Sequence, residues 1–239
     1  MDGEAMKILI PVLNSLRHYH RHQVIGMEHI PREGSALVVV NHSLATYDIA
    51  LLNAAIFAER GRFMRSLADH LFYRVPYLAQ LVEAIGAKEG NRHNARQLLE
   101  EGEMVCVAPG GMREALRPSS QRYQLRWEHR RGFAQIAIES QSPVIIGMCP
   151  RADDLYQVYA SPLTSWAYNK FKIPLFLARG LGFTPIPRPV KLIHHLSEPL
   201  YPPKPRAEPA AFKKQVEVFH RQIIKRAEAL IGESIAYRE

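Results

Sequence analysis

Short apolar runs alternate with longer segments of helical periodicity along most of the chain. The runs predict strands near Val24–Met27, Ala36–Asn41, Phe63–Ser66, Glu83–Ala87, Met104–Ala108, Pro143–Met148 and Val190–Leu196. The helical segments are predicted at Asp48–Glu59, Val75–Val82, Asn91–Glu101, Arg131–Ser140 and Ala210–Ile231. Because strands and helices alternate, the pattern predicts a layered α/β fold, a single domain in which helices flank a mostly parallel central sheet.

The first 23 residues are interpreted as an amphipathic helix that precedes the main domain, residues 24–239. The apolar positions of this segment share one helical face: Met6, Leu9, Ile10, Leu13 and Leu16. The chain then becomes basic and rich in histidine between Arg17 and His22. Two interpretations stay open, because such a helix either lies in a membrane interface, with its basic end on anionic headgroups, or covers part of the core.

The segment Ser161–Pro189 has a different character, because it mixes aromatic, aliphatic and basic side chains with prolines and glycines. Its large apolar residues are Trp166, Tyr168, Phe171, Leu175, Phe176, Leu177, Leu181 and Phe183. This mixture is typical of a membrane interface. A buried helical hairpin over the functional site explains it equally well, and the sequence leaves both interpretations open.

The composition limits the class of protein. A chain of 239 residues is long enough for one sizeable core, and no segment is typical of a linker between two equal domains. Lys and Arg number 31 against 23 Asp and Glu, so the formal net charge of +8 favours anionic partners such as lipid headgroups or the phosphates of coenzyme A. Nucleic acid is disfavoured as a partner, because the basic residues are spread along the chain and form no recognised nucleic-acid-binding motif.

Several features of the sequence bear on location. No stretch approaches the roughly 18 to 20 apolar residues of a membrane-spanning helix. The acidic Asp2 and Glu4 precede the first apolar stretch, which is not the charge order of a signal peptide. Cys106 and Cys149 both lie in apolar, strand-like runs, which indicates buried, reduced thiols. We therefore expect a cytoplasmic protein.

Five histidines are interpreted as solvated. His18, His20 and His22 alternate, which on a strand would put three imidazoles on one face, but no acid or cysteine nearby completes a metal site. His194 and His195 are interpreted in the same way. No metal site is predicted, and neither a Walker A loop nor a Gly-x-Ser-x-Gly elbow occurs, which argues against nucleotide hydrolases and serine hydrolases.

A histidine and a carboxylate follow the Ala36–Asn41 run within one loop. His42 stands at the predicted strand end, and Asp48, six positions further on, opens the next predicted helix. Such a loop can bring the two side chains into a hydrogen-bonded pair, in which the carboxylate sets the tautomer of an imidazole that acts as general base. A structural alternative stays open, with Thr46 as a helix N-cap, Asp48 in the first helical turn and His42 bonded to backbone.

A second loop of interest follows the Met104–Ala108 run. It reads Pro109-Gly110-Gly111-Met112-Arg113-Glu114, and its glycines let the backbone approach a ligand closely. The sheets of α/β proteins bind their ligands at strand ends of this kind. The two loops therefore predict a functional site at that edge of the sheet.

The two loops resemble motifs of the glycerolipid acyltransferase superfamily, the lysophosphatidic-acid type. The first motif of that family is a histidine and an aspartate separated by four residues, and the third is Pro-Glu-Gly-Thr-Arg. Here the third motif stands as Pro109-Gly110-Gly111-Met112-Arg113, followed by Glu114-Ala115-Leu116, a form similar to the branch of the diacylglycerol acyltransferases. Shorter similar stretches extend the resemblance over most of the chain: Ile85–Ala87, Arg131–Ala134, Ser142–Ile146, Thr184–Pro187 and Glu198–Leu200.

The resemblance implies an enzyme that transfers an acyl group from a thioester to a hydroxyl. His42, oriented by Asp48, would be the general base. The residues implied in substrate binding are Gly110, Gly111, Arg113 and Glu114. Backbone N–H groups near the two glycines would stabilise the oxyanion. Arg113 would either bind a phosphate of the donor or acceptor, or pair with Glu114 or another acid of the loop as scaffold. Acyl-coenzyme A is the implied donor, with acyl carrier protein as the second option, and neither a resident cofactor nor a metal is implied.

Two departures from the family pattern refine these expectations. Five residues rather than four separate His42 from Asp48, and Gly110 stands where the family has glutamate. The second departure favours a neutral mono- or diacylglycerol as acceptor. Two alternatives stay open: a lysophosphatidic acid or other lysophospholipid acyltransferase, and a non-catalytic basic protein that binds membrane or nucleic acid. Because the implied substrates are lipids, we expect peripheral attachment to the cytoplasmic face of a membrane.

Overall fold

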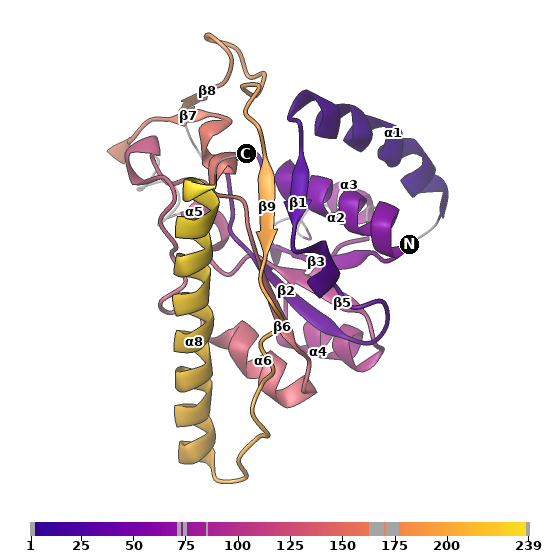
Figure 1. The fold of residues 1–239 in the computed structure, drawn as a ribbon, viewed down its shortest axis with the longest axis vertical. Helices are drawn as coiled ribbons and strands as arrows, with labels where there is room; N and C mark the ends of the chain where they lie inside the picture. Colours follow the sequence, from indigo (N-terminus) through magenta and orange to yellow (C-terminus); the bar gives the residue numbers. More distant parts are fainter. Residues whose placement is uncertain are drawn as a thin grey trace.

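The computed structural model describes residues 3–70, 73, 76–84, 86–162, 170 and 177–237. Its centre is a seven-stranded sheet with the strand order β1-β9-β6-β2-β5-β3-β4 (Figure 1). The strands of this sheet are β1 (Gln23–Ile25), β2 (Ala36–Val40), β3 (Met64–Ala68), β4 (Lys88–Glu89), β5 (Met104–Val107), β6 (Val144–Met148) and β9 (Ile193–Leu196). A separate antiparallel pair is formed by β7 (Gln157–Val158) and β8 (Ala178–Arg179).

Most neighbouring strands of the central sheet are parallel. β2 pairs in parallel with β5 and β6, and β3 pairs in parallel with β4 and β5. β9 is antiparallel to β6, while β1 is parallel to β9, so these two strands run against the others. The predicted α/β fold with a mostly parallel sheet is confirmed.

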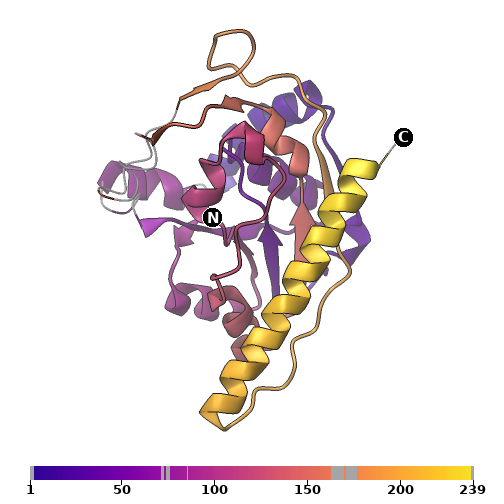
Figure 2. The ribbon, with the colours of Figure 1, turned by 90° about the vertical axis from the view of Figure 1, so that its left-hand side faces the viewer.

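Helices cover both faces of the sheet. They are α1 (Gly3–Tyr19), α2 (Tyr47–Arg60), α3 (Pro76–Ala84), α4 (Arg92–Glu100), α5 (Gly111–Ala115), α6 (Gly132–Ser140) and α8 (Pro209–Ala236), with 3-10 turns at Met27–His29, Ser119–Gln121 and Pro150–Asp154. Every residue of β2 is buried, because alternate side chains pack on opposite faces. Val38 and Val40 pack in the cluster that contains α2, whereas Leu37 and Val39 pack with α4, α6 and α8. Figure 2 shows the long helix α8, in yellow, running along the outside of the molecule on the side of the sheet that it covers.

One predicted strand is wrong. The sequence predicts a strand over Glu83–Ala87, but α3 continues to Ala84 and the strand begins at Lys88. Gly86 has a φ of 86°, and the N–H of Ala87 donates to the carbonyl of Val82 (3.1 Å). This is the backbone geometry of a glycine-terminated helix, and Glu83 and Ala84 belong to the last turn of α3 rather than to a strand.

The helix α1 packs on the core through part of its apolar face. Leu13 and Leu16 contact a cluster that includes residues of α2 and of the segment after β6, and the residue before β9: Leu51, Cys149, Ala152, Leu155 and Leu192. These contacts favour the core interpretation for the two leucines, which are partly buried, while membrane contact of this helix stays a prediction. The division of the chain into a helix of residues 1–23 and a domain of residues 24–239 stays a prediction.

The remaining sequence predictions about membranes and thiols have mixed outcomes. No helix within the described residues combines the length and hydrophobicity needed to span a membrane. Within the segment Ser161–Pro189, residues 163–169 and 171–176 lie outside the described residues, so both interpretations of that segment stay open. Cys106 and Cys149 are free and buried, as predicted.

Candidate active site

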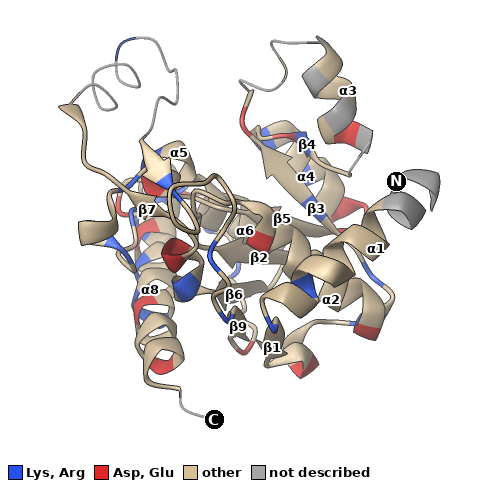
Figure 3. Cartoon of the chain, turned by 90° about the horizontal axis from the view of Figure 1, so that it is seen from above, with Lys and Arg blue, Asp and Glu red and all other residues tan. Residues whose placement is uncertain are grey.

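The carboxyl ends of β2, β5 and β6 meet at the edge of the sheet that Figure 3 shows from above. Asn41, the first residue after β2, ties two of these ends together. Its Nδ2 donates to the carbonyl of Cys149 (3.2 Å), and the N–H of Cys149 donates to its Oδ1 (2.8 Å). The backbone that carries His42 is therefore fixed relative to β6.

His42 has a defined tautomer. Its Nδ1 lies 2.9 Å from the carbonyl oxygen of Ser43. Because a carbonyl can only accept, Nδ1 carries the proton and Nε2 is the basic nitrogen. Burial lowers the pKa of His42, and the positive charge of Arg117 acts in the same direction, so the imidazole is neutral at pH 7. A neutral imidazole with an unprotonated Nε2 is the form that a general base requires.

Asp48 lies in the first turn of α2 and is only 1% exposed. Its Oδ1 accepts a hydrogen bond from the hydroxyl of Ser43 (2.8 Å), whereas its Oδ2 is buried without a hydrogen-bond partner. Burial raises the pKa of Asp48 to about 6, against the hydrogen bond from Ser43. The carboxylate is therefore mostly ionised at neutral pH.

Ser43 stands between the two predicted catalytic side chains. The sequence predicts a direct hydrogen bond between His42 and Asp48, but the imidazole bonds the Ser43 carbonyl and the carboxylate bonds the Ser43 hydroxyl. The expected pair is thus replaced by a bridge through one fully buried residue. Nothing at the sequence level separates Ser43 from the other loop residues, although it follows His42 directly.

The loop reaches α2 through a strained turn. Thr46 has a φ of 60° and a ψ of −32°, and the N–H of Tyr47 donates to the carbonyl of Ala45 (2.6 Å). A three-residue turn with positive φ is costly for a β-branched residue. Thr46 stands at the N-cap position as its alternative interpretation requires, yet its side chain makes no capping hydrogen bond. The turn takes up chain length in a loop that is one residue longer than the family motif.

Glu114 is completely buried and holds the second loop against the first. Its Oε1 accepts from the backbone N–H of His42 (3.0 Å), and its Oε2 accepts from Nε1 of Trp127 (2.8 Å). Nη1 of Arg117 lies 3.3 Å from Oε1. Burial raises the pKa of Glu114, while Arg117 opposes that shift. These contacts favour a positioning role for Glu114 over the direct substrate contact that the sequence predicts.

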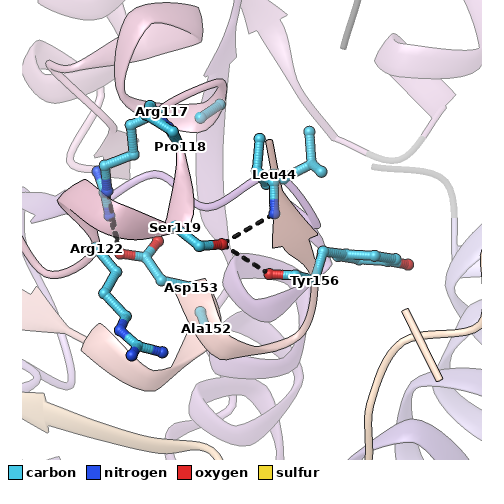
Figure 4. Close-up of a pocket in the computed structure, with 10 residues that line it drawn as sticks. Leu44, Arg117, Pro118, Ser119, Arg122, Ala152, Asp153 and Tyr156 are labelled. Carbon is cyan, nitrogen blue, oxygen red and sulfur yellow. Dashed lines mark hydrogen bonds and ion pairs between the residues drawn. The ribbon is translucent and has the colours of Figure 1, made fainter. Parts of the chain in front are cut away.

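Arg117 joins two buried carboxylates. Its Nε donates to Oδ2 of Asp153 (3.1 Å), and its Nη2 contacts the same oxygen (Figure 4). Its Nη1 faces Glu114. Asp153 also accepts from the backbone N–H of Tyr123 (2.8 Å). Nothing in the sequence predicts this network, because an arginine beside a predicted loop is normally solvated. The cavity next to it, about 10 Å³ and lined by Leu44 among others, has room for about one water molecule.

The glycines lie at the start of α5, which replaces the predicted turn. A Cβ built on Gly110 would lie 2.5 Å from Cβ of Glu114 and closer still to its carboxylate, so this position admits only glycine. Gly111 has a φ of 52°, and its N–H donates to the carbonyl of Ala108 (3.0 Å). That N–H is therefore engaged, whereas the N–H of Gly110 donates to none of the described residues.

Arg113 is exposed on α5 and makes no hydrogen bond or ion pair with a described residue. The sequence leaves open whether it binds a phosphate or pairs with Glu114. The second option is wrong, because Glu114 is enclosed with Arg117 and Trp127 instead. The charge of Arg113 thus stays available to a ligand.

The interpretation of the histidines as solvated is wrong for four of them. His20, His22, His194 and His195 are buried, and only His18 is exposed. Nδ1 of His20 lies 3.0 Å from the carbonyl of Val190, and its Nε2 lies 2.7 Å from the hydroxyl of Tyr47. Among the described residues, no group of three or more His, Cys, Asp or Glu could hold a metal ion.

The family and the fold of this chain are those of an acyltransferase. A model of the Acyltransferase family matches residues 21–149, and the chain belongs to that family. The crystal structure of the 1-acyl-sn-glycerophosphate acyltransferase PlsC from Thermotoga maritima aligns with a TM-score of 0.53 and 18% identity, over 95% of this chain and 81% of that one. This likeness shows the shared fold.

Curated relatives are similar over most of the chain. A protein named "DGAT1/2-independent enzyme synthesizing storage lipids" from Homo sapiens is 36% identical over 197 residues, which is 82% of this chain and 59% of the relative. The protein of the same name from Bos taurus is 36% identical over 82% of this chain and 57% of its own length. An uncharacterized protein of Mycobacterium tuberculosis is 27% identical over 72% of this chain and 50% of its own length. The chain thus spans between a half and three fifths of these relatives.

Proposed function

We propose that the protein transfers a fatty acyl group from acyl-coenzyme A to a hydroxyl of a glycerolipid, with a neutral mono- or diacylglycerol as the preferred acceptor. The observation that carries the proposal is the tautomer of His42. The Ser43 carbonyl holds the proton on Nδ1, which leaves a neutral imidazole with its basic Nε2 at the strand-end edge.

The chemistry needs no covalent enzyme intermediate. Nε2 of His42 takes the proton of the acceptor hydroxyl while its oxygen attacks the thioester carbonyl carbon. When the tetrahedral intermediate collapses, the carbon–sulfur bond breaks and the thiolate takes the proton back from the imidazolium. The products are the ester and free coenzyme A. Ser43 links Asp48 to His42, so the carboxylate stabilises the imidazolium through this bridge.

The α5 loop supplies the remaining groups. We assign the oxyanion contact to the N–H of Gly110, because the N–H of Gly111 is already bonded to Ala108. We assign the phosphates of the donor to Arg113, whose guanidinium is exposed and unpaired among the described residues. Arg117 is a poor candidate for that contact, since its charge is compensated by buried carboxylates.

A neutral acceptor is favoured because two described arginines close to this loop already face carboxylates: Arg117 faces Glu114 and Asp153, and Arg122 faces Asp154. A lysophosphatidic acid acyltransferase is the alternative, and it would use Arg113 for the acceptor phosphate rather than for the donor. One measurement distinguishes an Arg113 that binds the phosphates of the donor from an Arg113 that binds the phosphate of the acceptor. If Arg113 binds the donor, Arg113→Gln raises the KM for acyl-coenzyme A and leaves that for the acceptor unchanged; the reverse pattern would favour the alternative.

The principal test is the turnover of a His42 variant. Purified protein is mixed with labelled acyl-coenzyme A or acyl carrier protein and a panel of neutral and phosphorylated acceptors, and the release of free thiol is followed together with the ester. His42→Ala should lower turnover by roughly 10² to 10⁴-fold. His93→Ala is the control, because His93 is an exposed histidine on α4. A folded His42→Ala protein with wild-type turnover would contradict the proposal. A preference for phosphorylated acceptors would contradict the neutral mono- or diacylglycerol and favour the lysophosphatidic acid alternative.

We also propose that the protein works while docked on a membrane surface, on the cytoplasmic side that its two free cysteines favour. The support is the loop between β8 and β9, which projects from the same end of the molecule as α5 (Figure 1). Leu181, Phe183 and Ile186 are exposed on this loop, Phe183 by 90%. Arg179 lies 4.9 Å from the ring centre of Phe183 and adds positive charge to the apolar tip.

Vesicle sedimentation tests this docking surface. The Leu181→Ser, Phe183→Ser double variant should bind vesicles less than wild type, and binding should be stronger on anionic than on neutral vesicles and weaken with salt. Tyr201→Ser is the matched control, because Tyr201 is also an exposed aromatic residue, with 76% of its surface exposed. It follows Leu200, which pairs with Val144 at the start of β6, at the end of that strand opposite to the active-site edge. Undiminished binding of the double variant would exclude this loop as the anchor.

A further inference from the structure

A row of polar side chains from separate elements ends on Asp48. Nε of Arg17, in the last turn of α1, donates to Nδ1 of His22 (3.3 Å). Nε2 of His22 lies 2.9 Å from Nδ1 of His194, and Nε2 of His194 lies 4.0 Å from Oδ2 of Asp48. His22 is 8% exposed, and His194 and Asp48 are each 1% exposed. The proposed mechanism does not use the first three of these residues.

The antiparallel strand β9 brings this row to the site. Met148, the last residue of β6, pairs with His195, so the start of β9 lies beside the carboxyl end of β6. β1 pairs with β9 in turn, with Val24 opposite His194, and His22 immediately precedes β1. The edge strand β1 and its neighbour β9, which both run against the rest of the sheet, thus carry imidazoles to the active-site edge.

The arginine gives the row one direction. A guanidinium only donates, so Nδ1 of His22 must be unprotonated and the proton of this ring sits on Nε2. Nε2 of His22 then donates to Nδ1 of His194, which places the proton of the second ring on its Nε2. That N–H faces Oδ2 of Asp48. Each step follows from the previous donor, so a single tautomer of each ring is compatible with the row.

Neither imidazole can take a second proton without loss of a contact. A cationic His22 would turn an N–H against the N–H of Arg17, and a cationic His194 would turn one against His22. Burial acts in the same direction, since it lowers the pKa of His22 to about 3 and holds the pKa of His194 well below its usual value. His194 therefore faces the Asp48 carboxylate as a neutral donor.

Asp48 lacks a partner on the oxygen that His194 faces. Its Oδ1 is bonded to Ser43, while Oδ2 is buried without a hydrogen bond. A buried carboxylate oxygen without a donor is unfavourable, and the N–H of a neutral imidazole stabilises negative charge there. The separation of 4.0 Å is longer than a hydrogen bond, so the contact is electrostatic in this structure.

We propose that Arg17, His22 and His194 form a directed donor row, and that His194 is the positioning residue that holds the Asp48 carboxylate ionised and oriented towards Ser43. The functional part of this inference rests on the proposed function, because it takes Asp48 as the support of His42. The tautomers assigned to His22 and His194 do not depend on the proposed function. They can be measured without substrate.

The first experiment is nitrogen NMR on protein with labelled histidine. The His194 and His22 signals are identified by their loss in His194→Gln and His22→Gln. Both rings should be neutral Nε2–H tautomers between pH 6 and 8, and Arg17→Met should make the His22 ring a mixture of tautomers. An Nδ1–H tautomer, a mixture in the wild type or a cationic ring in this range would overturn the donor row.

The second experiment is the turnover of His194 variants. His194→Phe keeps the ring shape but removes the donor, and it should lower kcat by roughly 10 to 100-fold with little change in KM. His194→Gln keeps an N–H near the position of Nε2 and should recover most of that loss. His195→Phe is the matched control, because His195 is a buried neighbour that points to the other face of β9 and contacts Tyr237.

The outcomes separate the two proposals. A folded His194→Phe protein with wild-type kcat, or a loss in His194→Gln as large as in His194→Phe, would overturn the positioning role. Should His194→Phe not fold, the comparison of His194→Gln with wild type and the NMR tautomers still decide the proposal. Wild-type turnover in His42→Ala would refute the proposed function alone, and the NMR result would then stand by itself.

Discussion

The carboxylate of Glu114 lies over the α-carbon of Gly110, in the space that a side chain at position 110 would occupy. Gly110 stands where the acyltransferase motif has glutamate, so a carboxylate is present at this place although it comes from one turn further along the chain. From there it reaches the backbone N–H of His42 (3.0 Å). The glycine and the glutamate therefore form one structural unit of the α5 loop.

Gly110→Ala should destabilise the protein. The added methyl group would overlap the side chain of Glu114, which is held by Trp127 and Arg117 and has no free volume to enter. Overpacking of this kind costs about 1–3 kcal/mol in the free energy of unfolding. Urea denaturation measures it. Gly132→Ala is the control, since a Cβ there meets nothing within 4 Å, and this variant should be neutral or slightly stabilising.

Glu114→Gln should lower both stability and turnover. An amide has one acceptor oxygen, so it cannot accept from both the His42 N–H and Nε1 of Trp127 as the carboxylate does, and it carries no charge to face Arg117. The free energy of unfolding should fall by about 1–3 kcal/mol, because a buried donor loses its partner. Turnover should fall because the backbone of His42 loses its anchor, while the KM for acceptor stays near wild type. Glu128→Gln, at an exposed position, should change neither quantity.

An effect of Glu114→Gln confined to the acceptor KM would contradict the positioning role of Glu114. It would favour the direct substrate contact that the sequence predicts. Circular dichroism of the native state distinguishes that result from unfolding.

The sequence predicts the fold well because parallel central strands are buried on both faces and appear as uninterrupted apolar runs. Ala36–Val40 is such a run, and all five residues are buried. The wrong strand at Glu83–Ala87 is short, begins with a charged residue and lies at a helix end, where Gly86 rather than hydrophobicity marks the boundary. Periodicity over so few residues cannot separate the two cases.

The site is predictable as far as strand ends and residue types allow. His42, Asp48 and the α5 loop are found because each follows a recognisable apolar run. The bridge through Ser43 depends on the backbone course of the loop, which the strained Thr46 sets. His194 is missed for a different reason. Adjacent histidines on an edge would be solvated, but β9 lies between β1 and β6 and is covered by neighbouring elements.

Leu13→Ala should destabilise the fold, because α1 packs on the core. Leu13 contacts the cluster around Leu51 and Leu155 and is partly buried. Removal of a partly buried leucine side chain should reduce the free energy of unfolding by about 1–2 kcal/mol, below the range for fully buried sites. Val12→Ala is the neighbouring control, because Val12 is 55% exposed and should lose less than about 0.5 kcal/mol.

Thermal and urea unfolding give these values directly. Equal stability of the Leu13→Ala and Val12→Ala proteins, with weaker vesicle binding in the first, would assign Leu13 to a membrane face and not to the core.

Asp48→Asn should raise stability while it lowers turnover. Burial raises the pKa of Asp48 to about 6, above the ordinary value of 3.8 expected in the unfolded chain. The folded protein therefore binds this proton more tightly, so the group favours folding below pH 3.8 and loses that contribution as the pH rises through 6. Above pH 6 the buried, ionised carboxylate costs on the order of 1–3 kcal/mol. An asparagine carries no charge and avoids that cost.

Urea denaturation of Asp48→Asn and wild type at pH 8 and pH 4 checks the sign. The stability gain should be present at pH 8 and shrink towards pH 4, where the wild-type carboxyl is protonated. Turnover of the wild type should decline as the pH falls below about 6, since the ionised carboxylate supports His42. Glu128→Gln, at an exposed position, should show no such pH-dependent gain. A gain of equal size at both pH values, or a loss at pH 8, would mean that the buried charge of Asp48 is not what limits stability.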